Sequence, residues 1–133
     1  MMEIEYKFDS IPSTNAIIDL YRSSGINRPI TDTERIAKMY RNSNLVVSAW
    51  INGELVGIAR SLTDFCYSCY LSDLAVNKEY QHQGIGKKLI ELTQEKISPE
   101  SMLLLLSAPA AMGYYPKIGL QKVENGFIIK RER

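Results

Sequence analysis

The sequence predicts a mixed α/β (α+β) fold, in which helices flank a twisted, mixed β-sheet in the order βααβββαβαββ. Two observations lead to this class. Segments with alternating or continuous apolar residues, which are typical of strands, alternate along the chain with amphipathic segments whose apolar residues recur at helical spacing. A strand ending at Val76, a helix beginning near Ile85 and an apolar run at 102–106 also form a β-helix-β unit, whose right-handed crossover places both strands parallel and adjacent. We expect residues 1–133 to be a single domain, because a chain of this length typically forms one hydrophobic core.

The first third of the chain predicts one strand and two helices. Apolar residues alternate with charged ones over about 3–8, which indicates a strand. Ser13 is suited to cap the helix that follows, and Gly25 is suited to end it. The pair Thr31-Asp32 offers a cap for a second, shorter helix that stops near Asn42.

The middle of the chain is rich in predicted strands. We expect strands at 45–51 and 54–62, joined through Asn52-Gly53, because this dipeptide strongly favours a type I′ hairpin turn. A further strand is expected over 67–76. The continuous run at 102–106 is too short to span a membrane and is typical of a strand buried on both faces.

The last part of the chain predicts a short helix and two closing strands. Ser107 can cap this helix, whose first turn tolerates Pro109, and Gly119 ends it. Segments 121–123 and 126–130 then have the pattern of strands. An exposed final hairpin would present a free edge, so a homodimer is compatible with this arrangement.

Two glycines mark the turn between the strand ending at Val76 and the helix after it. The first amides of a helix lack intrahelical partners and carry partial positive charge, so they attract anions. Gly84 and Gly86 lack the side chains that would keep a pyrophosphate from these amides. A dinucleotide fingerprint is disfavoured because Leu89 stands where its third glycine would fall, and a Walker loop because Lys87 is not followed by Ser or Thr. Taken alone, the glycines are equally consistent with a turn that binds nothing.

Two motifs resemble those of the GNAT superfamily of N-acetyltransferases. Residues 81–86 (Gln-His-Gln-Gly-Ile-Gly) fit the coenzyme A loop pattern Gln/Arg-x-x-Gly-x-Gly/Ala and follow Leu74-Ala75-Val76 at a strand end. Residues 111–120 are similar to the family segment Ala-x-x-Phe-Tyr-x-Lys-x-Gly-Phe. The resemblance is specific from about Asp73 to Leu120. It implies the GNAT fold, in which the two parallel strands splay apart around the pantetheine arm.

The resemblance implies acetyl-CoA-dependent transfer of an acetyl group to a primary amine by direct attack, without an acyl-enzyme. Backbone amides at the strand end would hold the thioester. The coenzyme-binding residues that it implies are Leu74, Ala75, Val76, Gln81, His82, Gln83, Gly84, Ile85, Gly86, Lys87 and Ser107. Many relatives have Asn where this chain has Ala108, so the resemblance implies a weaker affinity for the coenzyme, with Ser107 as the expected substitute. For His82 and Lys87, simple exposure to solvent is the alternative.

Tyr115 falls on the family position that donates a proton to the coenzyme A sulfur. A phenol with a pKa of about 10 is suitably matched to a thiolate leaving group. Pro116 disfavours helical geometry at Tyr115, so Tyr114 is the alternative acid. A half-buried aromatic without a catalytic role is the remaining alternative.

The acceptor side is less defined, and its candidates are Asp73, Asn27 and Arg28. Asp73 lies in a strand that should be largely buried, so its carboxylate needs a partner. It either helps to accept the amine proton through water or, as we favour, bonds a neighbouring loop. The family builds its acceptor pocket partly from the loop between the first two helices, which holds Asn27 and Arg28. Arg28 would suit an acidic acceptor, although a solvated arginine is the simpler alternative.

Composition narrows the partners further. The formal charge of +1 favours no nucleic-acid partner, and no apolar run is long enough to span a membrane. The N-terminus is unlike a secretory signal, so we expect a cytoplasmic protein. Cys66 and Cys69 are the only cysteines and are expected to be reduced and structural, with a redox pair as the alternative. We expect no metal site. The alternative function is a non-catalytic coenzyme A-binding sensor or interaction module.

Overall fold

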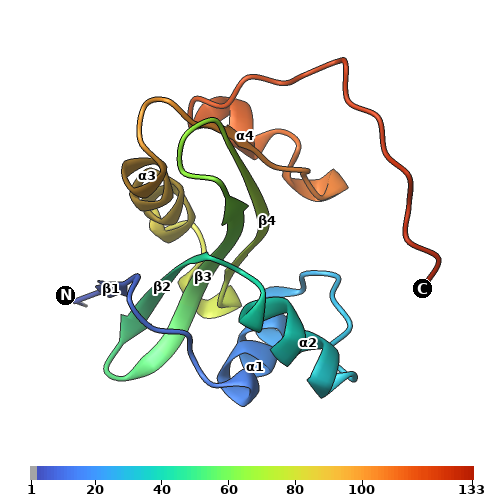
Figure 1. Ribbon diagram of the computed structural model, residues 1–133. Coiled ribbons are helices and arrows are strands. Elements are labelled where there is room, and N and C mark those ends of the chain that lie inside the picture. Colours follow the sequence, from blue (N-terminus) through green and yellow to red (C-terminus); the bar gives the residue numbers. More distant parts are fainter. Residues whose placement is uncertain (1–2) are drawn as a thin grey trace.

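A five-stranded sheet in the order β1-β2-β3-β4-β5 forms the centre of the computed structural model, which describes residues 3–133 (Figure 1). Strands β1 to β4 are antiparallel neighbours, whereas β5 pairs with β4 in parallel. The strands are β1 Glu5–Lys7, β2 Leu45–Ile51, β3 Glu54–Thr63, β4 Ser68–Val76 and β5 Met102–Leu104. The predicted mixed sheet and its parallel crossover are therefore confirmed.

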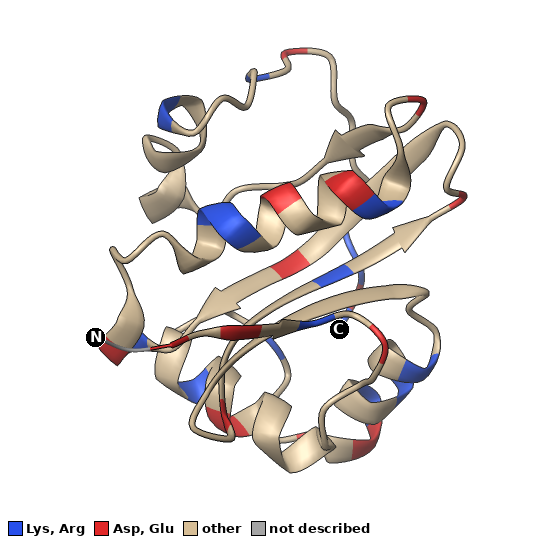
Figure 2. Ribbon diagram, turned by 90° about the vertical axis from the view of Figure 1, so that its left-hand side faces the viewer, with Lys and Arg blue, Asp and Glu red and all other residues tan. Residues whose placement is uncertain are grey.

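Helices cover both faces of this sheet, with α3 on one face and α1 and α2 on the other (Figure 1). The helices are α1 Thr14–Ser24, α2 Thr33–Arg41, α3 Ile85–Ile97 and α4 Tyr114–Lys117, with short 3-10 turns η1 Lys78–Tyr80 and η2 Pro109–Ala111. Figure 2 shows acidic and basic residues interspersed along α3, whose apolar side faces the sheet. Within residues 3–133, no helix has both the length and the apolar character that crossing a membrane requires.

The alternation of side chains along the central strands divides the core into two layers. Val47 and Leu71 pack on the α3 side, whereas Val46 and Ile58 pack on the side of α1 and α2. Successive side chains of a strand point to opposite faces, so each central strand contributes to both layers. Burial on both faces explains why these strands have nearly continuous apolar sequences. It also holds the carboxyl end of β4 firmly between the two layers.

The capping and turn signals in the first half of the sequence are confirmed. The side chains of Ser13 and Asp32 each accept the backbone N–H three residues further on, at 3.2 Å and 3.1 Å. Gly25 ends α1 in the left-handed conformation, with φ 81°. In the β2–β3 turn, Asn52 and Gly53 have φ values of 50° and 81°, positive at both positions as a type I′ turn requires.

Strands β4 and β5 separate soon after they meet. Their pairing joins residues 68–70 to residues 102–104, and from Leu71 to Val76 the sheet partner of β4 is β3 alone. The strand predicted over 102–106 therefore ends at Leu104. The splay implied by the family resemblance is present, and it opens at the carboxyl end of β4. Ligands of open α/β sheets bind at this end.

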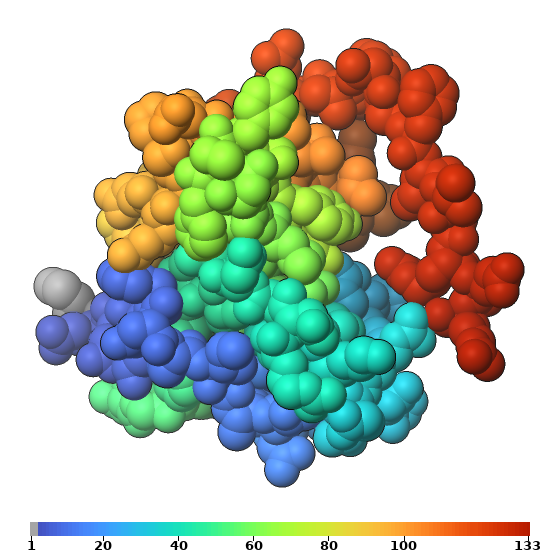
Figure 3. All heavy atoms as spheres, in the orientation of Figure 1, coloured from blue at the N-terminus to red at the C-terminus, as the bar shows by residue number. Residues whose placement is uncertain are grey.

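The end of the chain differs from the prediction. The Ser107 hydroxyl donates to the Ala108 carbonyl at 2.8 Å, and η2 begins without a side-chain cap, so the predicted capping role of Ser107 is wrong. The strands predicted at 121–123 and 126–130 are also absent. Residues 121–133, the C-terminal tail, stand away from the sheet (Figure 3). A strand needs a second strand to satisfy its backbone groups, and within residues 3–133 none pairs with the tail.

Candidate functional site

The turn from β4 into α3 leaves the first amides of that helix accessible. Gly84 precedes the helix with φ 82°, a conformation that a residue without Cβ adopts at little cost. No side chain caps α3, and Ile85, 1% exposed, anchors the first turn in the core. The first backbone N–H groups of α3 are therefore available to an anion.

Gly86 lies where this turn, the end of β4 and α4 come together. A Cβ built on Gly86 would lie 3.2 Å from the Tyr114 hydroxyl, 3.8 Å from Val76 Cγ2 and 4.0 Å from Leu74 Cδ2. The first of these distances is tighter than ordinary van der Waals contact, so only glycine lets the groups meet without displacement. The two sequence motifs are thus adjacent in space.

The carboxyl end of β4 forms the wall of the splay. Along one edge, Leu74, Ala75 and Val76 pair with β3. Within residues 3–133, the opposite edge of β4 has no strand partner over this stretch. Gln81 Nε2 donates to the Val76 carbonyl at 3.0 Å, which ties the glycine turn back to the strand. Backbone groups on the unpaired edge are suited to bind an extended amide chain, as in strand addition.

Other predicted coenzyme residues lie at the margin of this arrangement. His82, Gln83 and Lys87 are exposed on the turn and the first part of α3. His82 has φ 67°, so the turn contains a non-glycine residue in the left-handed region. Ser107 is half-buried, and its hydroxyl is engaged by the Ala108 carbonyl. The structure therefore brings together the residues of the β4 end, Gln81 and the two glycines, and places these four residues at the solvent side of the turn or beyond β5.

The two tyrosines of α4 occupy different environments. Tyr115 is half-buried and packs against the core on the α3 side, whereas Tyr114 is 39% exposed and its hydroxyl reaches Gly86. Their rings meet edge to face, with centroids 5.2 Å apart. Burial raises the pKa of both phenols, and the neighbouring Tyr114 raises that of Tyr115 further. Both groups are therefore protonated at neutral pH and able to donate a proton.

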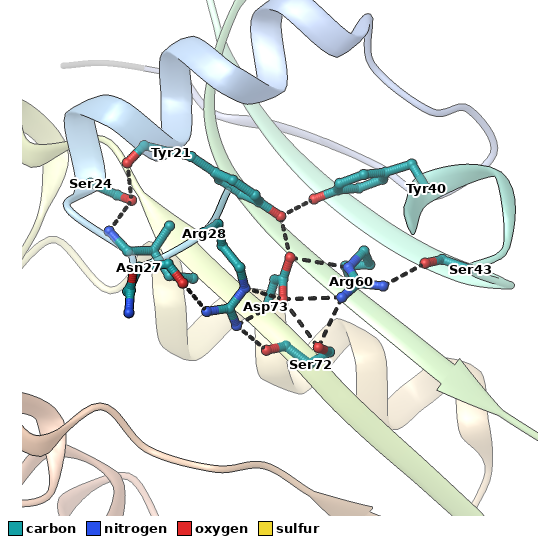
Figure 4. A network of polar contacts seen from close by, with 10 residues as sticks. Tyr21, Ser24, Asn27, Arg28, Tyr40, Ser43, Arg60, Ser72 and Asp73 are labelled. Atoms are coloured by element: carbon teal, nitrogen blue, oxygen red, sulfur yellow. Dashed lines mark hydrogen bonds and ion pairs between the residues drawn. The ribbon is translucent and has the colours of Figure 1, made fainter. Parts of the chain in front are cut away.

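A polar network centred on Asp73 joins the loop after α1 to strands β3 and β4 (Figure 4). Its carboxylate accepts hydrogen bonds from Arg28 Nε at 2.9 Å, Arg60 Nε at 3.0 Å, the Ser72 hydroxyl at 3.1 Å and the Tyr21 hydroxyl. The Tyr40 hydroxyl bonds that of Tyr21, so both helices of this face take part. Asp73 itself is fully buried.

The charges in this network keep the Asp73 carboxyl ionised. Burial alone would raise the pKa of Asp73, but hydrogen bonds and charge from Arg60, together with Tyr21 and Arg28, outweigh it and lower the pKa. Burial also raises the pKa of Tyr21 and of Tyr40 well above the usual value for a phenol. Asp73 is thus ionised and fully bonded, which supports its structural role over proton transfer from an amine.

Of the other acceptor-side candidates, Arg28 is committed to the network and Asn27 is exposed. Arg28 Nη2 donates to the Ser72 carbonyl at 2.7 Å, and Nη1 donates to the Asn27 carbonyl at 2.7 Å. All three nitrogens of this guanidinium therefore have partners within the protein. This arrangement argues against Arg28 as a receptor for an acidic acceptor and makes it an anchor of the loop.

Arg60 is the charged residue of the network that sequence reasoning missed. A lone arginine in the strand 54–63 was a usable signal, because a buried charge requires an opposite one and Asp73 is the acidic residue of the next strand. The two residues are direct partners in the β3–β4 register. Because the register shifts between Arg60 and Ser61, counting residues outward from the turn does not identify that pair.

Both cysteines are free thiols, as the sequence predicts. Cys66 is exposed and Cys69 is buried. Burial raises the pKa of the Cys69 thiol, which lowers its thiolate content and its reactivity. Over residues 3–133, no group of three or more histidine, cysteine, aspartate or glutamate side chains is placed to hold a metal ion.

Comparisons with known proteins support the fold and identify the family. Residues 19–130 match the family model described as an acetyltransferase (GNAT) domain. The chain is 29% identical to an uncharacterized N-acetyltransferase, ycf52, of Pyropia yezoensis, over 93% of this chain and 76% of that protein. Its fold is similar to that of a probable acetyltransferase of Staphylococcus aureus, with a TM-score of 0.82, 24% identity and coverage of 97% of this chain and 100% of that one. It is also similar to an aminoglycoside N-acetyltransferase, AAC(6')-Iy, solved in complex with CoA, with a TM-score of 0.74, 11% identity and coverage of 100% and 97%. The chain belongs to the GNAT acetyltransferase family.

Proposed function

We propose that this protein transfers the acetyl group of acetyl-CoA to a primary amine by direct attack of the amine on the thioester. The observation that carries the proposal is that the free amides of α3 and the unpaired end of β4 meet at Gly86, beside the two tyrosines of α4. The amides suit the pyrophosphate, the strand edge suits the pantetheine arm, and one of the tyrosine hydroxyls suits the departing thiolate. The solved CoA complex of an aminoglycoside N-acetyltransferase with the same fold supports the choice of donor.

In this proposal the coenzyme is held mainly by the backbone. The pyrophosphate binds the first amides of α3, where Gly84 and Gly86 allow close approach. The pantetheine arm lies along the unpaired edge of β4 at Leu74 to Val76, which also polarises the thioester carbonyl. His82, Gln83 and Lys87 contribute at most contacts from the solvent side, since their side chains are exposed.

The chemical step requires a proton donor for the coenzyme thiolate, and one of the two α4 tyrosines supplies it. Tyr115 has the position implied by the family motif, whereas the Tyr114 hydroxyl has the position nearest the glycine turn. We propose Tyr115 as the general acid, with Tyr114 as the alternative. Raised pKa values keep either phenol protonated until the pH is strongly alkaline.

The acceptor amine binds on the side of the α1–α2 loop. Because Asp73 and Arg28 are bonded to one another, we propose that they shape this loop and do not contact the amine. Exposed Asn27 is the member of the predicted trio that is free to face an acceptor. Positioning donor and amine together then supplies much of the rate, since proximity can lower a barrier by several kcal/mol, up to roughly 7–11 in intramolecular models.

Release of free CoA on incubation with acetyl-CoA and a mixed panel of amines tests this function. An enzyme releases CoA only when an amine is present, and fractionating the panel then identifies the acceptor. The second candidate, a non-catalytic coenzyme A-binding module, is favoured by Ala108, which cannot supply the amide hydrogen bonds of the Asn usual there. Binding of acetyl-CoA by calorimetry without amine-dependent CoA release would establish that alternative.

A further inference from the structure

Gly57 lies inside β3, where glycine is an unfavourable residue. Glycine weakens a strand, because it adds backbone freedom to the unfolded chain and contributes no side chain to the sheet. The backbone conformation does not require it, since Gly57 is not among the residues with positive φ, although the β2–β3 register shifts nearby between Ala49 and Trp50. The usual remaining cause is the close approach of a neighbouring element.

The first turn of α3 is that neighbouring element. Figure 2 shows α3 running across the face of the sheet. A Cβ built on Gly57 would lie 3.0 Å from Ile85 Cγ2 and 3.1 Å from Leu89 Cδ1, both tighter than ordinary van der Waals contact. Ile85 and Leu89 are 1% and 0% exposed, so neither side chain has open space to move into. The helix therefore rests directly on the backbone of β3.

Ile85 is the first residue of α3, and its branched side chain couples this contact to the helix backbone. Its Cγ2 methyl is bonded to Cβ, and χ1 of isoleucine has one strongly preferred rotamer in a helix. This methyl moves only with the first turn of the helix, whereas the Leu89 methyl can turn about χ2. A side chain at Gly57 would therefore shift the first turn of α3 by a few tenths of an ångström.

Gly57 also adjoins the end of β4. Its register partner is Val76, the last residue of that strand, and the Asn77 backbone N–H donates to the Val56 carbonyl at 2.8 Å just beyond it. One residue of β3 thus contacts both the end of β4 and the first turn of α3. In the proposed function these two places hold the pantetheine arm and the pyrophosphate. Since both groups belong to one covalently linked ligand, the distance between the two places must match it.

We propose that Gly57 is a positioning residue for the coenzyme. Because it has no side chain, it sets the height of the first turn of α3 above the sheet, and with it the distance from the α3 amides to the end of β4. The inference rests on the proposed function, which assigns the amides and the strand edge to acetyl-CoA. Gly57 acts through α3, because Ile85 and Leu89 cover the side on which its Cβ would lie.

Calorimetry of acetyl-CoA binding to Gly57→Ala tests this role, with thermal melting to verify that the protein is folded at the temperature of measurement. The added methyl leaves the amides and the strand edge chemically unchanged, so a loss of affinity reports their displacement. We expect the dissociation constant to rise at least about tenfold, since small misplacements of binding groups are costly. Ile58→Val is the control. It changes the next residue of β3, which is buried against the opposite layer, and should keep the affinity within about twofold.

Ile85→Leu provides a second measurement, because leucine carries no methyl on Cβ and so leaves room above Gly57. The double variant Gly57→Ala/Ile85→Leu should bind acetyl-CoA more tightly than Gly57→Ala. It should also bind more tightly than Ile85→Leu, since the added Cβ fills the space that Cγ2 leaves. The second comparison decides the question even where Gly57→Ala alone does not fold. Losses that simply add in the double variant would overturn the proposal.

A truncated donor separates a changed distance from a general loss of structure. S-acetyl-pantetheine lacks the pyrophosphate and the nucleotide, so it uses the end of β4 without the α3 amides. With an amine identified in the panel, Gly57→Ala should lower kcat/KM at least about tenfold for acetyl-CoA and less than about threefold for S-acetyl-pantetheine. Equal losses with both donors would assign Gly57 to the fold alone.

Two outcomes distinguish failure of this inference from failure of the proposed function. Wild-type affinity for acetyl-CoA in a folded Gly57→Ala protein would overturn the positioning role and leave the proposed function intact. A wild-type protein that binds no acetyl-CoA would overturn both.

Discussion

Replacing Asp73 by Asn tests whether this residue supports the fold or takes part in proton transfer. The change removes the one negative charge that faces Arg60 and Arg28, whose side chains are 9% and 27% exposed. Removing one partner of a buried ion pair typically costs about 3–5 kcal/mol, and partial exposure of Arg28 places the expected cost at about 3–4 kcal/mol. For a domain of this size, that loss lowers Tm by roughly 10–20 °C.

The assay is thermal unfolding at pH 7 followed by circular dichroism. Glu34→Gln is the matched control, because it removes a carboxylate whose 3.0 Å ion pair with Arg41 is exposed. That change should cost less than about 1 kcal/mol. If Asp73→Asn melted within a few degrees of wild type while amine-dependent CoA release disappeared, the structural role would be refuted and a proton-transfer role established.

The pH dependence of stability gives the same prediction a second measurement. The pKa of Asp73 is lowered in the folded protein, so its contribution is complete above the unfolded pKa, about 4, and is lost as the pH falls through the lower folded value. Wild type should therefore lose stability on acidification below about pH 4 more steeply than Asp73→Asn. Parallel curves for the two proteins would mean that the network does not stabilise the ionised carboxylate.

Three further changes test the proposed site. Gly86→Asp should abolish acetyl-CoA binding in calorimetry without unfolding the protein, since it adds a side chain and a negative charge beside the α3 amides; Gly126→Asp, at a site with no atom within 4 Å, is its control, and wild-type affinity in a folded Gly86→Asp protein would contradict the assignment. Tyr115→Phe should lower kcat at least about tenfold with little change in coenzyme affinity, whereas Tyr114→Phe should cost little; the reverse order would transfer the acid role to the hydroxyl nearest Gly86. Cys66→Ser should keep amine-dependent CoA release within a few-fold of wild type, because direct attack uses no thiolate, and an acetylated Cys66 trapped during turnover would show otherwise.

The features that sequence predicted best are those decided by neighbouring residues. Ser13 and Gly25 bound α1, and the Asn52-Gly53 turn sets the β2–β3 hairpin, because caps and tight turns depend on a few local dihedral angles and hydrogen bonds. The glycine turn before α3 was also readable, since positive φ and close approach both select glycine. These signals were sufficient to order the elements and to locate the candidate site.

In features that join distant segments, the sequence did not identify which residues are partners. The Arg60–Asp73 pair joins two strands across a register shift, and the contact between Gly86 and the Tyr114 hydroxyl depends on how α4 is placed after η2. The prediction of two closing strands was wrong for a related reason. Segments 121–123 and 126–130 have strand patterns, but a pattern specifies only which faces are apolar, and not which edge, or whose edge, the strand will join.

The position of Asp73 in β4 links the two sides of the proposed site. The residue directly precedes Leu74 to Val76, the stretch whose unpaired edge would hold the acyl donor, and its carboxylate bonds Arg28 of the loop that would face the amine. Both sides are therefore tied to one strand, which is buried between two helical layers. Because the loop is fixed through hydrogen bonds of 2.7 to 2.9 Å and not through flexible packing, its distance from the end of β4 is set when the sheet forms. The reaction that we propose depends on bringing two substrates into register and requires such a fixed distance, so the fully buried Asp73 carboxylate has a structural purpose in that proposal.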